Sequence, residues 1–319
     1  MRLFKRLFTV SVIFLIVVLI AAIIYVLQFK EEPSVIKEPE KQTKQIEPQK
    51  AITPKEGKAK LVKEKPLSLK TAPEKEKKKI VISKIGKVPL PLRQIAIIID
   101  DIGHDLGPVK ELLKINADLT FAILPFCTYT REAAEMLHRA QRETLLHLPM
   151  EPDSYPREKP GNGALFTDMN DEELVFQLEK DLAAVPYISG VNNHMGSKFM
   201  EDEKKLSLIF SKLKKNNLFF IDSRTSANTK AFAASEKVGL PVVARKIFLD
   251  NSRDYNEIYN NLINIAKNNG DVSPVIVVGH PYPETIRAIN DAIKVIREKG
   301  ISIVPVSQII KAKASDRTS

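Results

Sequence analysis

The sequence of 319 residues contains a single cysteine, Cys127, so no disulfide can form within the chain. Cysteine thiolates therefore cannot be the main ligands of a metal site. A glycine-rich dinucleotide fingerprint is absent as well, because the turn after the first apolar run of the folded region reads Asp101-Ile102-Gly103-His104. These absences exclude an intrachain disulfide framework and argue against a nucleotide cofactor.

A small-residue cleavage pattern is missing at the end of the N-terminal apolar segment, where Ala21-Ala22 is followed directly by bulky residues. The segment runs without a charge from 7 to 29, and about 20 residues suffice to cross the hydrocarbon core as a helix. We expect residues 1–29 to form an uncleaved single-pass anchor in the inner membrane, with a cleaved signal peptide as the alternative. Basic residues before the run favour a cytoplasmic N-terminus, which places the rest of the chain in the periplasm or outside the cell.

Residues 30–93 are rich in Lys, Glu, Pro and Gln and show no apolar periodicity. Such a segment cannot bury enough apolar surface to offset the entropy of ordering it, so we expect a disordered linker. The net charge of +10 comes from this linker and the N-terminus, whereas residues 94–319 carry a formal charge of about −2. A nucleic-acid-binding domain needs a basic surface, so nucleic acid is not an expected partner.

From residue 94 onward, short apolar runs rich in β-branched residues alternate with stretches of helical periodicity. The expected strands are 95–99, 119–124, 144–148, 187–191, 218–221, 241–249, 275–278 and 301–306. The expected helices are 109–115, 130–141, 168–182, 203–216, 254–269 and 284–299. Alternating strands and helices imply a parallel sheet. The sequence therefore predicts an α/β fold, a parallel (β/α) barrel of seven to eight strands over residues 94–312 with a flexible tail at 313–319. A doubly wound open sheet is the alternative.

Acidic residues and histidines, with one arginine, lie at or just after the ends of five of the expected strands, where reactive residues gather in parallel α/β folds. These residues are Asp100 and Asp101, His147 and Glu151, His194, Asp222 and Arg224, and His280. Histidines and carboxylates without thiolates suit Zn²⁺ or a similar divalent ion that keeps a water-bearing position. Such a metal supports hydrolysis of an amide or an ester, with a carboxylate as base and a histidine as acid.

Several acidic, basic, histidine and cysteine residues of the folded region can be explained by a structural role instead of a catalytic one. Asp222 and Arg224 either take part in catalysis directly or form a structural ion pair that orients a catalytic neighbour. His138 lies in a charged amphipathic helix and is expected at the surface. Cys127 is expected to be a packing residue, and His104 is expected to cap a helix, with a place at the rim of the site as the alternative.

Five stretches of the folded region resemble motifs of the divergent polysaccharide deacetylase family, within the glycoside hydrolase/deacetylase β/α-barrel superfamily. They are Ile97–Gly103, Leu146–Glu151, Asn192–Ser197, Phe220–Thr225 and Gly279–Thr285. The resemblance implies that Asp100 is the general base, that Asp101 and His147 bind a metal and that His280 is the general acid. Glu151 stands where the second histidine of the family's His-x-x-x-His motif would be, and an Arg-x-Pro-Tyr motif is not evident. We expect His194 to supply the missing metal ligand, with Glu151 as the second choice.

The resemblance implies a metal-dependent hydrolase of the cell envelope with a polysaccharide as its partner. It would deacetylate an N-acetylated polysaccharide such as peptidoglycan or an exported glycan, with a divalent metal, first of all Zn, as cofactor. The departures from the family's ligand pattern leave a second hypothesis, a non-catalytic glycan-binding or envelope-organising protein on the same fold. Both Asp100 and His280 are retained, and a binding protein has no evident need for a base together with an acid.

Overall fold

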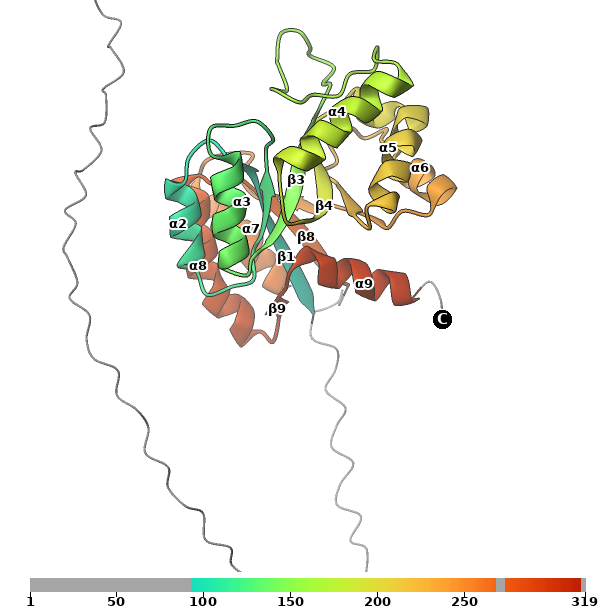
Figure 1. The fold of residues 1–319 in the computed structure, drawn as a ribbon. Coiled ribbons are helices and arrows are strands. Elements are labelled where there is room, and N and C mark those ends of the chain that lie inside the picture. Colours follow the sequence, from blue (N-terminus) through green and yellow to red (C-terminus); the bar gives the residue numbers. More distant parts are fainter. Residues whose placement is uncertain (1–92, 268–272, 317–319) are drawn as a thin grey trace, which may run out of the picture. The chain divides into compact units, whose positions relative to one another are not determined.

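The computed structural model of the protein describes residues 93–267 and 273–316. The expected membrane anchor at 1–29 lies outside the described residues, as does the expected linker at 30–93 except for Arg93. Within the two described ranges, no helix is both long enough and apolar enough to span a bilayer. The described chain folds as a parallel sheet surrounded by helices (Figure 1).

The strands of the sheet agree closely with the apolar runs of the sequence. They are β1 (Gln94–Ile102), β2 (Thr120–Ile123), β3 (Glu143–Met150), β4 (Ile188–Met195), β5 (Phe219–Asp222), β6 (Val242–Ala244), β7 (Ile247–Phe248), β8 (Val275–Gly279) and β9 (Ser302–Ile303). The helices are α2 (Gly107–Leu113), α3 (Thr130–Arg139), α4 (Asp171–Ala184), α5 (Glu203–Lys215), α6 (Ala231–Val238), α7 (Tyr255–Lys267), α8 (Pro283–Glu298) and α9 (Val306–Asp316). A 3₁₀ turn, Phe199–Glu201, precedes α5. Neighbouring strands pair in parallel throughout the described sheet.

The strand order is β6-β5-β4-β3-β2-β1-β8-β7, with β9 beside the start of β1. The edge strands β6 and β7 are separated in the chain only by Arg245 and Lys246. The backbone amide of Arg245 donates to Asp222 O on β5 at 3.0 Å, and that of Lys246 donates to Ile276 O on β8 at 2.8 Å. The connection between β6 and β7 therefore hydrogen-bonds to β5 near one edge of the sheet and to β8 near the other. The expected parallel α/β fold is confirmed. Strands β1 to β8 form a half-barrel, and the short β9 pairs with β1 beside it. This strand order excludes a doubly wound sheet, in which the order of the strands reverses at a switch point.

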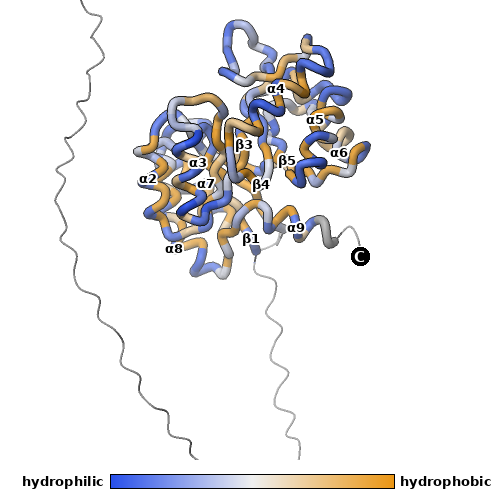
Figure 2. Tube along the Cα trace, viewed as in Figure 1, coloured by the Kyte–Doolittle hydropathy of each residue, from blue (hydrophilic) through white to orange (hydrophobic). Residues whose placement is uncertain are grey.

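Both faces of the strands are apolar because both faces are covered. Ile97 and Ile99 belong to the cluster that packs against the helices, whereas Ala96 and Ile98 belong to the cluster inside the barrel. Ile309 of α9 joins the interior cluster, and α9 crosses the lower end of the strands in Figure 1. Figure 2 shows apolar strands at the centre and hydrophilic segments mainly toward the outside.

The start of α9 is held by side chains from distant strands. The Val306 amide donates to Thr120 Oγ1, and the Ser307 amide donates to Glu143 Oε2, each at 3.1 Å. The helix continues to Asp316, so the expected tail at 313–319 begins inside α9, and residues 317–319 lie outside the described residues. Because α9 covers the N-terminal ends of the strands, the C-terminal ends are left to form a site.

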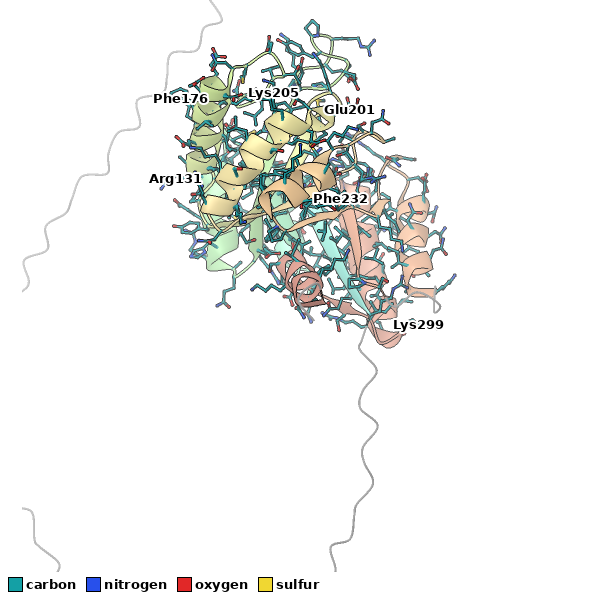
Figure 3. The ribbon with its side chains drawn as sticks, turned by 90° about the vertical axis from the view of Figure 1, so that its right-hand side faces the viewer. Arg131, Phe176, Glu201, Lys205, Phe232 and Lys299 are labelled. Atoms are coloured by element: carbon teal, nitrogen blue, oxygen red, sulfur yellow. The ribbon has the colours of Figure 1, made fainter. Side chains whose placement is uncertain are left out.

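The connections at the C-terminal ends of the strands include the long loop 151–170 between β3 and α4, at the top of Figure 1. Asn170 closes this loop and caps α4. Its side chain accepts from the Glu173 amide and its own amide donates to the Glu173 carboxylate, both at 2.9 Å. Figure 3 shows Lys205, near the start of α5, toward this end of the barrel and Lys299, just after α8, toward the other.

Candidate metal centre and active site

Two adjacent carboxylates at the end of β1 take part in one site. In a regular strand, neighbouring side chains point to opposite faces, so Asp100 and Asp101 could not both face the mouth of the barrel. The pairing of β1 with β2 shifts register between Ile99 and Ile102, and Asp101 has a positive φ of 58°. Such an irregularity re-aims a side chain, and aspartate is among the residues that tolerate this conformation. The break in the strand therefore brings both carboxylates to the rim.

Three donor atoms form a small triangle at this rim. Asp101 Oδ1 lies 3.2 Å from His147 Nε2 on β3 and 3.1 Å from His194 Nδ1 on β4. The two imidazole nitrogens are 3.1 Å apart. In a tetrahedral zinc site with bonds of about 2.0–2.1 Å, two ligand atoms lie about 3.3 Å from each other. The three residues that the sequence analysis selected as metal ligands thus stand at the spacing that a single small divalent ion requires.

The charge balance of the triangle also fits a cation. Asp101 Oδ1 is buried and has no well-formed hydrogen bond with any of the described residues. Burial opposes ionisation of Asp101, but the neighbouring imidazoles of His147 and His194 outweigh burial and lower the pKa of the carboxyl group. A buried carboxylate oxygen without a donor is costly unless a cation satisfies it. The orphaned oxygen and the two imidazoles therefore suit a bound divalent ion.

Asn192 determines which nitrogen of His147 faces the triangle. Its Nδ2 donates to Asp100 Oδ1 at 2.8 Å, so its Oδ1 is left to accept from His147 Nδ1 at 2.9 Å. With the proton on Nδ1, the lone pair of His147 Nε2 points into the triangle. The arrangement follows from the sheet, because His147 and Asn192 are register partners on β3 and β4. Outer contacts of this kind orient metal-binding histidines and tune their basicity.

Asp100 lies beside the triangle without belonging to it. Its side chain is almost completely buried, and its Oδ2 is 3.7 Å from His147 Nε2. Burial raises the pKa of Asp100, the charge of His147 opposes the shift, and the charge of Asp101 adds to it. A general base works best when its pKa is close to the working pH, so a raised carboxyl pKa suits this role.

His280 follows β8 and is held in place by Asp250. The backbone amide of His280 donates to Asp250 Oδ2 at 2.6 Å, and its Nδ1 donates to Asp250 Oδ1 at 3.0 Å. Thr285 Oγ1 donates to the same buried carboxylate at 2.7 Å. Burial lowers the pKa of His280, but the bond to Asp250 and the charges of the nearby acids outweigh burial and raise it. His280 Nε2 lies 3.7 Å from Asp101 Oδ2, where a protonated imidazole can serve as an acid.

The remaining site residues selected from the sequence, Glu151, Asp222 and Arg224, lie outside the metal-binding triangle. Glu151 is buried and accepts from the Thr167 amide at 2.7 Å and from Lys198 Nζ at 2.8 Å, so both of its oxygens are engaged elsewhere. Asp222 is buried at the end of β5 and accepts from the backbone amide of Arg224 at 2.7 Å. The side chain of Arg224 is exposed. Neither Asp222 nor Arg224 contributes an atom to the metal-binding group, and the second choice for a ligand, Glu151, is not part of it either.

A cleft of about 490 Å³ opens beside the triangle, and Asp101 and His194 form part of its wall. Phe126, which is 44% exposed, offers an apolar ring on the same cleft. Cys127 and His104 also line it, with Cys127 Sγ 3.6 Å from His104 Nε2. The expectation that His104 caps a helix is wrong, since the amide of Gly107 at the start of α2 donates to Asp105 Oδ1 at 2.9 Å, and the alternative place at the rim holds. His104 is instead an exposed residue of the cleft.

Two functional residues were missed by the sequence analysis although signals for both were present. Asn192 and His194 are two positions apart on β4, and residues at that spacing face the same side of a strand. Asp250 directly follows the expected strand 241–249, so the same rule that selected Asp100 and His280 would have selected it. His138, in contrast, is exposed on α3 as expected and stacks on Tyr187.

Comparisons with known proteins point to one family. Residues 97–310 match the family model described as divergent polysaccharide deacetylase. The uncharacterized protein YibQ of Escherichia coli strain K12 is 32% identical over 235 residues, which cover 72% of each chain. An uncharacterized protein of Haemophilus influenzae is 28% identical over 208 residues, which cover 64% of this chain and 72% of that one. The crystal structure of an uncharacterized protein from Agrobacterium tumefaciens C58 is similar with a TM-score of 0.63 and 23% identity, covering 68% of this chain and 89% of that chain.

The likeness to the Agrobacterium structure concerns the fold, because the identity is low. The family match is more specific. It begins within β1 and ends within α9, so it includes the metal-binding triangle together with Asp100 and His280. Since that match spans well over half of the chain, the protein belongs to the divergent polysaccharide deacetylase family.

Proposed function

We propose that this protein is a zinc-dependent hydrolase that removes acetyl groups from an N-acetylated polysaccharide of the cell envelope, such as peptidoglycan or an exported glycan. The observation that carries the proposal is the presence of a buried carboxylate, Asp100, and an oriented imidazole, His280, beside one metal-binding triangle. A protein that only binds glycans has no evident need for both groups. The hydrolase is therefore preferred to an envelope-organising protein on the same fold.

The donor set supports zinc as the metal. Two imidazoles and one carboxylate, without thiolates, are a common set of protein ligands in catalytic zinc sites. An ion held by Asp101, His147 and His194 would polarise the acetyl carbonyl and lower the pKa of a bound water.

The protein's own residues supply the proton transfers. Asp100 Oδ1 already accepts from Asn192, so Oδ2 is the atom available to take a proton from the attacking water. His280 Nδ1 is bound to Asp250, so Nε2 is the atom that delivers a proton to the departing nitrogen. The water oxygen forms a bond to the carbonyl carbon, the carbon–nitrogen bond breaks, and the products are acetate and an amine.

The test is metal analysis together with release of acetate from N-acetylated glycans, on the purified full-length chain. We expect about one zinc per chain. His194→Ala should lose most of the metal and the activity, while His138→Ala, the same change at an exposed histidine of α3, should keep both. Metal without acetate release from peptidoglycan or other N-acetylated glycans would favour the glycan-binding alternative. Failure to bind any divalent ion under metal-replete conditions would refute the hydrolase.

We also propose that the chain is anchored in the inner membrane by residues 1–29, with the folded domain in the periplasm or outside the cell. The proposal rests on the uncharged apolar run and the basic residues that precede it. Fractionation of cells should find the full-length chain in the membrane fraction, and protease added to spheroplasts should digest the folded domain. A soluble, shortened chain would indicate a cleaved signal peptide instead.

A further inference from the structure

An arc of arginine and aromatic side chains lies along the rim beside His280. The ring centroids of Phe248 and Tyr282 lie 5.2 and 5.4 Å from that of His280. The guanidinium of Arg245 lies over Phe248, 4.9 Å from the ring centroid, and that of Arg253 lies over Tyr282 at 3.8 Å. These side chains therefore form a continuous row from Arg245, just after β6, to Tyr282 at the start of α8, where Arg253 stacks on the ring.

Arg224 extends this set at the end of β5. Arg245 Nη2 donates to Arg224 O at 3.2 Å, and Arg245 Nε donates to Ser223 O at 2.6 Å. The side chains of Arg224 and Arg253 are exposed, while that of Arg245 is partly buried. We call Arg224, Arg245, Phe248, Tyr282 and Arg253 the arginine arc.

The arginine arc has no carboxylate partner of its own. Within residues 93–267 and 273–316, none of its three arginines forms an ion pair. Elsewhere Arg131 pairs with Glu135, Arg142 with Asp118 and Arg287 with Asp291, whereas Arg139, Arg157 and Arg297 form no ion pair with a described residue. This concentration of positive charge occurs in a folded region whose formal charge is about −2.

Two of the acids near the arc are occupied by other contacts. Asp250 is bound to His280 and Thr285, and Asp254 accepts from the Glu257 amide in the first turn of α7 at 2.8 Å. Asp222 accepts from a backbone amide. The charges of Asp100 and Asp222 act on Arg245, and the charge of Asp222 also acts on Arg224. Nearby acids therefore offset part of the charge on these two arginines, whereas the exposed guanidinium of Arg253 is available to a ligand.

Resting on the proposed hydrolase function, we propose that the substrate is an anionic glycan, in which a carboxylate near the reacting N-acetyl group binds to the arginine arc. A guanidinium that stacks on a ring by its flat face keeps its N–H edge available for a carboxylate. Stacking on Tyr282 also restricts Arg253, which reduces the entropy lost on binding. The arc adjoins His280, so a charge bound there lies next to the reacting bond.

The test compares two forms of one glycan with the zinc-loaded full-length protein. The first is a peptide-free peptidoglycan strand, in which alternate sugars carry a carboxylate, and the second is the same strand with its carboxylates converted to amides. We expect kcat/KM to be about tenfold higher for the carboxylate form. Arg253→Gln should reduce this preference about three- to tenfold, mainly through KM, and Arg224→Asn should act in the same direction. Asparagine is chosen at position 224 because it tolerates the positive φ of 55° there.

Controls separate this inference from the proposed function. Arg139→Gln removes the same charge from an exposed position at the end of α3 and should leave the preference unchanged. Raising the salt concentration from about 0.05 to 0.5 M should weaken the preference, because exposed charge pairs are screened. Binding of both strands to Asp100→Asn is measured in parallel. If Asp100→Asn binds the carboxylate strand more tightly than the amide strand while the wild type releases acetate from neither, the arc is sustained and the hydrolase is refuted. Equal hydrolysis of both strands, unaffected by Arg253→Gln, would refute the arc and sustain the hydrolase.

Discussion

Replacing Asn192 with alanine should weaken metal binding although Asn192 is not a ligand. Its side chain is fully buried and joins Asp100 to His147 by hydrogen bonds of 2.8 and 2.9 Å. Removing it frees the His147 ring to take the other tautomer and leaves two buried polar groups without a partner, at a cost of about 1–3 kcal/mol each. Loss of such an outer contact typically lowers metal affinity about 10–100-fold, which corresponds to about 1.4–2.7 kcal/mol.

Competition with a chromophoric chelator measures the zinc affinity of Asn192→Ala and of wild type. Asn193→Ala is the matched control, because Asn193 is equally buried but faces away from the site and bonds to Met195 O and Thr225 Oγ1. Both variants should unfold at a lower temperature, yet only Asn192→Ala should lose metal affinity by tenfold or more. If the two variants bind zinc within about threefold of each other, the orienting role of Asn192 is refuted.

Three further changes test the site and its surroundings. Glu151→Gln should keep its metal, because Glu151 contacts Lys198 rather than the triangle, and metal analysis would expose a ligand role through metal loss. Asp250→Asn should lower kcat about 10²–10⁴-fold with unchanged metal content, because His280 loses its anionic partner. Steady-state kinetics measure this change, and a kcat within about tenfold of wild type would contradict the role of Asp250. Burial raises the pKa of Asp181 from 3.8 to about 8, so the folded state disfavours its ionised form and stability declines as the pH rises from about 4 to 8. Asp181→Asn keeps an acceptor for Gln177. Urea unfolding should therefore show the variant to be about 2–5 kcal/mol more stable than wild type at pH 8 and nearly equal to it at pH 4. An equal difference in stability at both pH values would contradict the raised pKa of Asp181.

Most of the sheet could be predicted because its strands are buried on both faces. A strand such as Ile95–Ile99 then consists of consecutive apolar residues, all β-branched except Ala96, which no surface helix would carry. Even the run 241–249 was found as one unit, although it divides into β6 and β7, because the division is only a change of hydrogen-bonding partner. The candidate site residues followed from the same pattern, since they stand at the ends of strands with clear boundaries, whereas their roles as metal ligands were implied by the family resemblance.

Helices α6 and α9 were not predicted, and for α9 the reason is its dependence on contacts between distant residues. The start of α9 is stabilised by Thr120 and Glu143, which lie far away in sequence, so the local sequence contains no capping signal that predicts the helix. The apolar segment 301–306 therefore looked like a strand, although only Ser302–Ile303 pairs with β1. The role of Glu151 could not be read either, because only the fold brings Lys198 within 2.8 Å of it.

The pair Asp100-Asp101 shows how one local irregularity yields two different functions. Sequence alone gives two neighbouring carboxyl groups, which a regular strand would place on opposite faces. The left-handed backbone at Asp101 turns its oxygen into the triangle, where two imidazoles lower the pKa of that carboxyl, while Asp100 stays buried with a raised pKa. When the environment drives two such pKa values apart, the two carboxyl groups can take different roles, here metal ligand for Asp101 and base for Asp100. A residue that cannot adopt positive φ at position 101 would therefore lose both the ligand and this separation, even if its side chain carried a carboxylate.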